Sequence, residues 1–134
     1  MAEQIVEWTS ELETGVTEID AQHKTLFDLL NRLQAAVAEG REQEVIGEAL
    51  VEMSSYADKH FKTEQQYVEL DPGFKDHLLE HWDFSKKCIS LVMSFRKDNS
   101  VSMETIRFLL NWLKNHILER DVVIIKRLKK EGRI

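Results

Sequence analysis

Apolar residues recur every three or four positions along most of this 134-residue chain, and only three short stretches interrupt the pattern. Such spacing places the apolar side chains on one face of an α-helix. The interruptions are of the kind that end helices, because they contain glycine, the only proline or a run of polar residues. They lie at Gly40, at Asp71-Pro72-Gly73 and at residues 97–100. The pattern therefore predicts four helices and argues against a β-rich fold.

The predicted helices cover residues 18–38, 42–69 and 74–96, and the fourth begins near residue 101. Thr17 and Ser100 are the expected N-caps of the first and fourth helices. On the second helix, Val45 and Ala49 are expected to begin the inward-facing stripe. All three connections are short, so neighbouring helices should run antiparallel. The sequence thus predicts an all-α fold, an up-down-up-down antiparallel four-helix bundle after a short irregular N-terminal segment.

Composition and charge narrow the range of partners. With 43% hydrophobic residues, residues 1–134 fit one domain with a substantial core. A net charge of −6 argues against nucleic acid as a partner, because phosphate binding needs a basic face. The basic cluster at residues 126–133 is expected to complement the dipole of the last helix. No apolar run approaches the ~20 residues of a membrane span, and residues 1–7 lack a signal core. We therefore expect a cytoplasmic protein that does not bind membranes.

All five histidines fall at spacings typical of metal ligands on helices. Residues four positions apart lie on the same helical face, so a pair of them can reach a common point. The candidate ligands are His60 with Glu64, His77 with His81, His116 with Asp121, and His23 alone in the first helix. One such pair is common by chance, but three helices with a pair each favour a site. Five imidazoles and two carboxylates suit two adjacent ions that share the carboxylates.

These seven residues are also expected at one height in the bundle. The first and third helices begin, and the second and fourth end, at the same end of an up-down-up-down bundle. At ~1.5 Å per residue, all seven lie within ~7–18 Å of that end. Buried Glu64 and Asp121 have no lysine or arginine at matching positions, so cations would offset their charge. The spacing of five sets Asp121 ~140° around the helix from His116, and we expect it to reach sideways as a bridging ligand.

Ligand chemistry limits the choice of metal. Imidazole and carboxylate without sulfur fit iron, manganese or zinc, and Cys88, the only cysteine, is expected to be a buried, unreactive thiol. Zinc is less favoured because closed tetrahedral sites need four ligands each. No histidine follows a glutamate by three positions, as in the Glu-x-x-His motif of ferritin-like bundles. We expect histidine-rich ligation to give an iron pair that binds O2 without readily activating it.

Four segments resemble the motifs of the hemerythrin family, and the resemblance runs from Trp8 to about Leu128. The segments are Gly15-Val16 with Ile19-Asp20-x-Gln22-His23-Lys24, His60-Phe61-x-x-Glu64, His77-x-x-x-His81, and Trp112-Leu113-x-x-His116-Ile117-x-x-x-Asp121. Each motif alone is weak, but together they are highly specific. The resemblance implies one hemerythrin-like domain over residues 1–134 that binds O2 reversibly at two iron ions with an oxo or hydroxo bridge.

The resemblance also implies a role for each ligand. Carried onto this sequence, the ligands are His77, His81 and His116 for one iron, His23 and His60 for the other, and Glu64 and Asp121 as bridges. The second iron would keep an open position for O2. Apolar side chains are expected to exclude water from it, and the candidates are Leu26, Phe27, Phe61 and Trp112. The alternative for these side chains is plain core packing.

Such a site would serve O2 transport, storage or sensing without enzymatic turnover. The alternatives are a di-iron oxidoreductase that reduces peroxide, O2 or nitric oxide, and an iron-storage protein. Reversible binding is favoured because no lysine, arginine or further histidine lies within one turn on the inward face of His23 or His60. A redox or O2-consuming protein of unknown identity would fit this role as a partner.

The sequence departs from the family pattern at two places. Gln65 stands where the family usually has a second glutamate. The interval from His60 to His77 is shorter than usual, and Leu70-Asp71-Pro72 replaces the common Tyr-Pro turn. We therefore expect a tight connection between the second and third helices.

Overall fold

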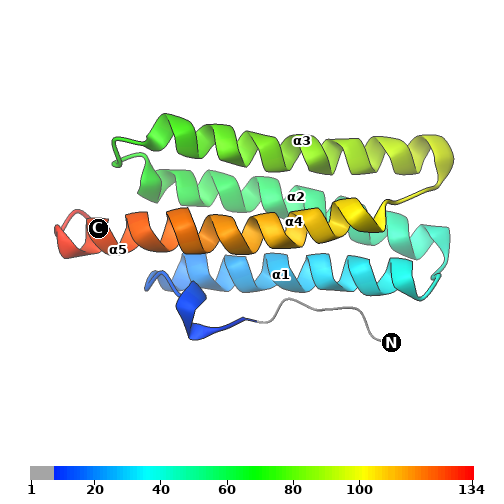
Figure 1. Ribbon diagram of the computed structural model, residues 1–134, viewed down its shortest axis with the longest axis horizontal. Helices are drawn as coiled ribbons and strands as arrows, with labels where there is room; N and C mark the ends of the chain where they lie inside the picture. Colours follow the sequence, from blue (N-terminus) through cyan, green and yellow to red (C-terminus); the bar gives the residue numbers. More distant parts are fainter. Residues whose placement is uncertain (1–7) are drawn as a thin grey trace.

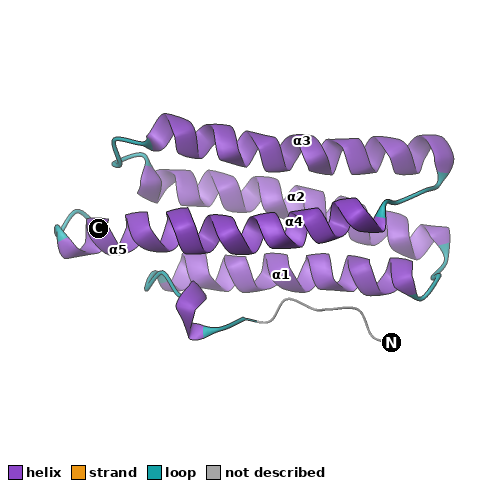
Figure 2. Ribbon diagram, viewed as in Figure 1, coloured by secondary structure: helices purple, strands orange, loops and turns teal. Residues whose placement is uncertain are grey.

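The computed structural model describes residues 8–134, which form four long helices packed side by side (Figure 1). Short loops join the helices at alternating ends, so successive helices run antiparallel (Figure 1). Helices and loops account for all of these residues, with no strand among them (Figure 2). The elements are η1 (Ser10–Leu12), α1 (Thr17–Ala38), α2 (Gln43–Val68), α3 (Phe74–Asp98), α4 (Met103–His116), η2 (Ile117–Asp121) and α5 (Val122–Lys130). The predicted antiparallel four-helix bundle is confirmed, and α4, η2 and α5 together make its fourth helix.

The buried apolar side chains form two clusters along the bundle. The larger cluster draws on all four helices and includes Leu30, Leu50 and Leu110. The smaller cluster lies at the end where α2 turns into α3, and consists of Ile19, Val68, Ile124, Ile125 and Leu128. Along each helix, the candidate ligands come between residues of the larger cluster and residues of the smaller one. The layer of candidate ligands therefore has apolar packing above and below it along the bundle axis.

The first helix begins differently from the prediction. Thr17 is the first helical residue, and Val16 occupies the N-cap without a side-chain hydrogen bond. Asp20 in the first turn accepts hydrogen bonds from the backbone N–H groups of Thr14 at 2.8 Å and Gly15 at 3.2 Å. The predicted cap at Thr17 is wrong because this carboxylate, not the threonine hydroxyl, fixes the chain where it enters the helix.

Two further local predictions are wrong by small shifts. The N-cap of α4 is Ser102, whose Oγ accepts a hydrogen bond from the N–H of Thr105 at 3.2 Å, and not Ser100. The α3 helix ends at Asp98, two residues later than predicted, so the four-residue loop is shifted and Ser102, the residue directly before α4, supplies the cap. The buried stripe of α2 begins at Ile46 and continues at residue 50, while Val45 and Ala49 are only half-buried. The larger side chains, Ile46 and Leu50, take the fully buried positions.

The fourth helix contains one π-helical turn, η2. The N–H of Val122 donates to the carbonyl oxygen of Ile117, which is the five-residue spacing of a π-helix. Five residues then complete about one turn, whereas five residues of α-helix would sweep ~140° beyond it. His116 and Asp121 therefore face the same side of the helix. The expected sideways reach of Asp121 is wrong for this reason.

The connection between α2 and α3 is tight and is held by α5. Asp71 is buried in this turn, where its Oδ2 accepts a hydrogen bond from the N–H of Gly73 at 2.8 Å. Arg127 of α5 forms an ion pair with the same carboxylate. Lys129 Nζ donates to the carbonyl oxygen of Gly15 at 2.9 Å. The C-terminal basic cluster therefore ties α5 to the turn and to the segment before α1.

None of the helices within residues 8–134 is long and apolar enough to cross a membrane. The absence of a signal core was predicted for residues 1–7, which lie outside the described part of the chain. Cys88 is buried, as expected, with its Sγ 3.8 Å from Met53 Sδ. Burial raises the pKa of this thiol to about 12, which keeps it in its unreactive protonated form.

Candidate metal centre

The structure brings all seven predicted ligands together in one buried layer that draws on every helix of the bundle. They are His23 of α1, His60 and Glu64 of α2, His77 and His81 of α3, His116 of α4 and Asp121 of η2. They form two groups that share Glu64, one with His23 and His60, the other with His77, His81, His116 and Asp121. Within each group the ligand atoms lie within 4.8 Å of one another. Either group is compact enough to hold one metal ion.

Glu64 lies at the centre of this layer, and its two carboxylate oxygens face different histidines. Oε1 lies 2.9 Å from Nε2 of His77 and 3.0 Å from Nε2 of His81. Oε2 lies 3.1 Å from Nε2 of His23 and 3.0 Å from Nε2 of His60. This is the arrangement expected of a carboxylate that bridges two cations.

Asp121 divides its oxygens in the same way. Oδ1 lies 3.0 Å from Nε2 of His77 and 3.2 Å from Nε2 of His116. Oδ2 lies 3.3 Å from Nε2 of His23. The turn of η2 makes this geometry accessible, because it places Asp121 on the same face as His116. All five imidazoles thus present Nε2 to the centre.

The ionisation of this layer follows from burial opposed by opposite charge. Burial alone would raise the pKa of Glu64, but hydrogen bonds from four histidines hold it well below its usual range. Burial would lower the pKa of His23 and His77, yet the carboxylates of Asp121 and Glu64 raise both to about 9. Without cations the layer therefore holds ionised carboxylates and protonated imidazoles at His23 and His77, whereas burial lowers the pKa of His81. Cations would replace these protons, because a neutral Nε2 offers them a lone pair.

Two polar side chains hold ligands from outside the layer. His60 donates from Nδ1 to Oε1 of Gln22 at 2.9 Å. His116 donates from Nδ1 to Oε1 of Glu80 at 2.8 Å, and Arg120 lies 2.7 Å from the other oxygen of Glu80. A hydrogen bond from Nδ1 fixes the tautomer that leaves the lone pair of Nε2 free for a metal. One ligand is thus supported by a neutral amide and the other by an ion-paired carboxylate.

The sequence reasoning gave no role to Gln22 or Glu80, although Gln22 lies within one of the quoted motifs. Each directly precedes a ligand, since Gln22 comes before His23 and Glu80 before His81. Each nevertheless supports a ligand on a neighbouring helix. A polar residue immediately before a ligand histidine was the available signal, but its partner depends on how the helices pack. Sequence spacing alone gives no information on that contact.

Phe61 packs against both groups of ligands. Its ring stacks on that of His81 with centroids 4.1 Å apart, and its centroid lies 5.6 Å from that of His60. Leu26 and Phe27 are buried three and four positions after the ligand of α1. Phe61 thus adjoins both groups, and Leu26 and Phe27 lie about one helical turn from His23, a member of the two-histidine group.

Trp112 lies on the other side of the layer. Its ring stacks on His116 with centroids 4.6 Å apart, so it adjoins the three-histidine group. It also lines a surface cavity of about 280 Å³, together with His116, Glu80 and Arg120. A second cavity of about 140 Å³ reaches His77. Water can therefore approach the three-histidine side from the surface.

The donor set fits two cations rather than a set of internal salt bridges. His116 Nε2 and Asp121 Oδ1 are buried and have no aligned hydrogen-bond partner among residues 8–134. Both atoms face the shared centre. Within the same residues, only histidines lie within ion-pair distance of Glu64 and Asp121. Imidazole and carboxylate without thiolate suit iron and related first-row metals.

A four-helix bundle with two overlapping histidine–carboxylate groups in its core defines this molecule as a di-metal helical-bundle protein. The model of the Hemerythrin HHE cation binding domain matches residues 14–128. That match covers most of the chain, which therefore belongs to the hemerythrin family.

Several relatives and solved structures resemble the chain over nearly its whole length. A bacteriohemerythrin from Methylococcus capsulatus is 35% identical over 122 residues, which cover 87% of this chain and 92% of that protein. One from Clostridium acetobutylicum is 32% identical over 123 residues, covering 85% and 94% respectively. A crystal structure of wild-type hemerythrin superposes with a TM-score of 0.83 at 31% identity, covering 92% of this chain and 99% of that one.

This membership confirms the predicted function, O2 binding at a non-haem di-iron centre. The family is in general one of O2-binding proteins rather than of enzymes. It also implies the di-iron cofactor, and the histidine–carboxylate cluster of this chain is able to hold metal.

Proposed function

We propose that the two groups of ligands hold one iron each. The assignment is His77, His81 and His116 to one iron, His23 and His60 to the other, and Glu64 and Asp121 to both. The division of oxygens at the two carboxylates supports it, because each carboxylate directs one oxygen to either side. The outward hydrogen bonds of His60 and His116 support it as well, because they leave Nε2 free for a metal.

The difference between the two groups supports an O2-binding role. One iron would have three imidazole ligands and the other two, so the second would keep a free coordination position beside His23 and His60. The iron pair, when bound, supplies the redox-active centre at which O2 binds. The protein holds the imidazoles and carboxylates in fixed positions, because the layer is packed between two apolar clusters.

The surroundings of the open position favour reversible binding over turnover. Leu26, Phe27 and Phe61 are buried beside it and exclude water. The nearest lysines in sequence point elsewhere. Lys24 Nζ lies over the ring of Trp8 at 5.2 Å, and Lys59 Nζ lies 5.8 Å from the ring centroid of Tyr56. Neither is placed to donate a proton to bound O2.

A di-iron oxidoreductase is the second candidate, and one observation favours it. Glu80 is only partly buried, and it links the ligand His116 to the exposed Arg120 in the wall of the 280 Å³ cavity. A polar path of this kind could carry protons from the solvent to the three-histidine side. It ends at the iron opposite the open position, so we rank turnover below reversible binding.

Repeated oxygenation of the reduced, iron-loaded protein tests the proposal. We expect O2 uptake, release under vacuum and slow autoxidation over several cycles. Absorption spectroscopy monitors each of these changes. Leu26→Ala should accelerate autoxidation, whereas Leu109→Ala, equally buried in the larger apolar cluster, should lower stability without that effect. Rapid oxidation with steady consumption of peroxide or nitric oxide in stopped-flow experiments would instead establish an oxidoreductase. Elemental analysis that finds one metal per chain, or zinc alone, would contradict the ligand assignment.

The proposal also retains the remaining expectations from the sequence. These are a single domain over residues 1–134, a cytoplasmic location, no binding of nucleic acid, and a redox or O2-consuming protein as partner. The net charge of −6 supports the expectation that the protein does not bind nucleic acid.

A further inference from the structure

The outer face of α3 carries a stripe of exposed apolar side chains. Leu79, Trp82, Ile89 and Met93 are 61%, 53%, 49% and 65% exposed. With Lys86 between them they follow one another at alternating intervals of three and four residues. That alternation is the heptad pattern by which one helix packs along another. We call these five residues the α3 stripe.

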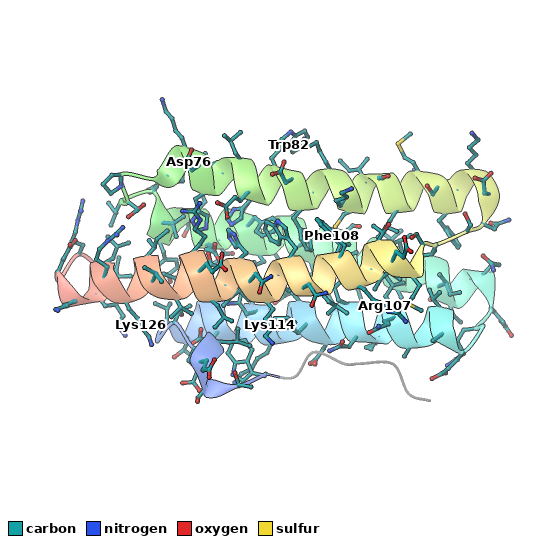
Figure 3. The ribbon with its side chains drawn as sticks, viewed as in Figure 1. Asp76, Trp82, Arg107, Phe108, Lys114 and Lys126 are labelled. Atoms are coloured by element: carbon teal, nitrogen blue, oxygen red, sulfur yellow. The ribbon has the colours of Figure 1, made fainter. Side chains whose placement is uncertain are left out.

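The α3 stripe lies on the side of the helix away from the bundle. The buried residues of α3 are His77, His81, Phe84, Cys88 and Leu91. Figure 3 shows Trp82 pointing away from the other helices. Nothing else within residues 8–134 covers the stripe, given how exposed its side chains are. A row of large exposed apolar side chains, interrupted here only by Lys86, is typical of a site of interaction.

We propose that the α3 stripe is a self-association surface, at which two copies of this chain pair α3 against α3 in antiparallel orientation. A helix with heptad spacing is matched best by a helix with the same spacing, and a second copy supplies one related by a two-fold axis. The stripe is only ~20 Å long at 1.5 Å per residue. An interface of one helix per copy falls below the standard size, so the dimer should be weak and dependent on concentration.

Charge complementarity favours this occupant and its orientation. Asp76 and Asp83 flank the stripe near the start of α3, while Arg96 and Lys97 lie near its end. All four side chains are exposed. Lys75 at the start and Asp98 at the end carry the opposite charges, but with Glu80 the start stays net acidic and the end stays net basic. In an antiparallel pair, the acidic start of one α3 therefore faces the basic end of the other. Opposite charges beside an apolar seam set the orientation of paired helices.

The position of Lys86 selects the register. In a parallel two-fold pair, Lys86 would face Lys86 of the second copy, with like charges in contact. In the antiparallel pair, Lys86 can instead face Ile89 of the second copy, which brings Trp82 opposite Met93. The ammonium of Lys86 already has Asp83 at 3.5 Å, and its methylene groups extend the apolar surface. The same register places Asp76 close to Lys97 of the second copy.

This self-association goes beyond O2 binding and does not depend on it. The stripe and the ligands occupy opposite sides of α3, so changes in the stripe should leave the metal layer intact. Iron content therefore reports on the proposed metal centre separately. Experiments use the iron-loaded chain, with iron content and far-UV circular dichroism as checks of folding.

Sedimentation velocity from low micromolar to near millimolar concentration is the test. We expect a monomer–dimer equilibrium that Ile89→Glu weakens by roughly tenfold or more, because each of the two copies loses an aliphatic side chain from the interface. Met93→Gln should weaken it in the same direction. Val51→Glu is the matched control, because Val51 on α2 is also 49% exposed but lies off the stripe, and it should change nothing.

Charge exchange tests the orientation. Asp76→Lys should weaken the dimer, and adding Lys97→Glu to the same chain should restore it, because each α3 then presents the opposite charge to its neighbour. Restoration would not occur in a parallel pair, where these residues do not meet. A chain that stays monomeric at all concentrations would overturn the proposal, as would a dimer insensitive to Ile89→Glu and Met93→Gln. Binding of the monomer to neutral phospholipid vesicles through the stripe would also overturn it, in favour of a lipid surface.

Discussion

Deletion of Glu119 should convert the π-helical turn η2 into ordinary α-helix without misplacing the residues that follow. Glu119 is exposed and lies within η2, between the ligands His116 and Asp121. A single π-turn accommodates one extra residue in an α-helix, through hydrogen bonds that span five positions instead of four. Removing one residue from the turn should restore the four-position hydrogen bonds and leave α5 in place.

Helix geometry gives the size of the effect. On a regular α-helix the five-residue interval from His116 to Asp121 would sweep ~500°, which is ~140° beyond one turn. In the deletion variant the interval is four residues, or ~400°, so Asp121 departs from the direction of His116 by only ~40°. This is the offset of any pair four positions apart, and such pairs meet on one face. Arg120 stays directly before Asp121 and should keep its contact with Glu80.

We therefore expect the Glu119 deletion to retain both irons. The melting temperature should rise by a few degrees, since one regained hydrogen bond is worth about 1 kcal/mol and shifts a domain of this size by about 4 °C. Deletion of Lys114, exposed within regular α4, is the control, because it turns every later residue by ~100° and should abolish iron binding. Elemental analysis and calorimetry measure both outcomes. If the Glu119 deletion lost iron as completely as the control, the π-turn itself would be required for metal binding. The view that η2 only accommodates an extra residue would then be wrong.

Three further outcomes are expected. Glu80→Gln keeps an acceptor for Nδ1 of His116 but removes the negative charge. The variant should release iron to a chelator about 10–100-fold faster, and an unchanged release rate would mean that the carboxylate does not support the ligand. Asp121→Ala should lower both iron content and melting temperature, because it removes an anion shared by two cations; a variant with both irons would show that another carboxylate is the bridge. In the iron-free protein, His23 and His77 have pKa values raised to about 9, so their stabilising protonation is complete below pH ~6.5 and is lost as pH rises towards 9. Denaturant titrations should show the free energy of unfolding falling over that range for the iron-free protein only, and a fall of equal size with iron bound would refute this reasoning.

Much of the architecture could be predicted because it depends on local spacing. The 3.6-residue period defines four helices whatever they pack against, and the short connections leave an antiparallel bundle as the simplest arrangement. The pairs His60 with Glu64 and His77 with His81 lie on single helices, so their common face follows from the same period. The convergence of ligands from different helices then follows from their distance to one end of the bundle.

The features that the sequence did not predict depend on packing or on a choice between near-equal local options. A spacing of five between His116 and Asp121 is compatible with an α-helix and a sideways reach, or with a π-turn, and the buried layer selects the second. Ser100 and Ser102 both suit an N-cap, and the residue at which α3 ends decides between them. The hydrogen bond from His60 to Gln22 joins two helices, so no pattern within either helix indicates it.

The shared carboxylates have a consequence for how the protein fills with metal. Glu64 and Asp121 each direct one oxygen to either side of the layer. Each side therefore shares both of its carboxylates with the other side. An ion on the three-histidine side alone would leave Oε2 of Glu64 facing His23 and His60, and Oδ2 of Asp121 facing His23. The imidazole of His23 would then stay protonated beside a nearby cation. In that half-filled state the bound cation repels the protonated imidazole, and each carboxylate bridge has only one of its two cations. Binding of the second ion removes both penalties. Loading should therefore be all-or-none, and a culture short of iron should yield a mixture of full and empty chains, with few that carry a single ion.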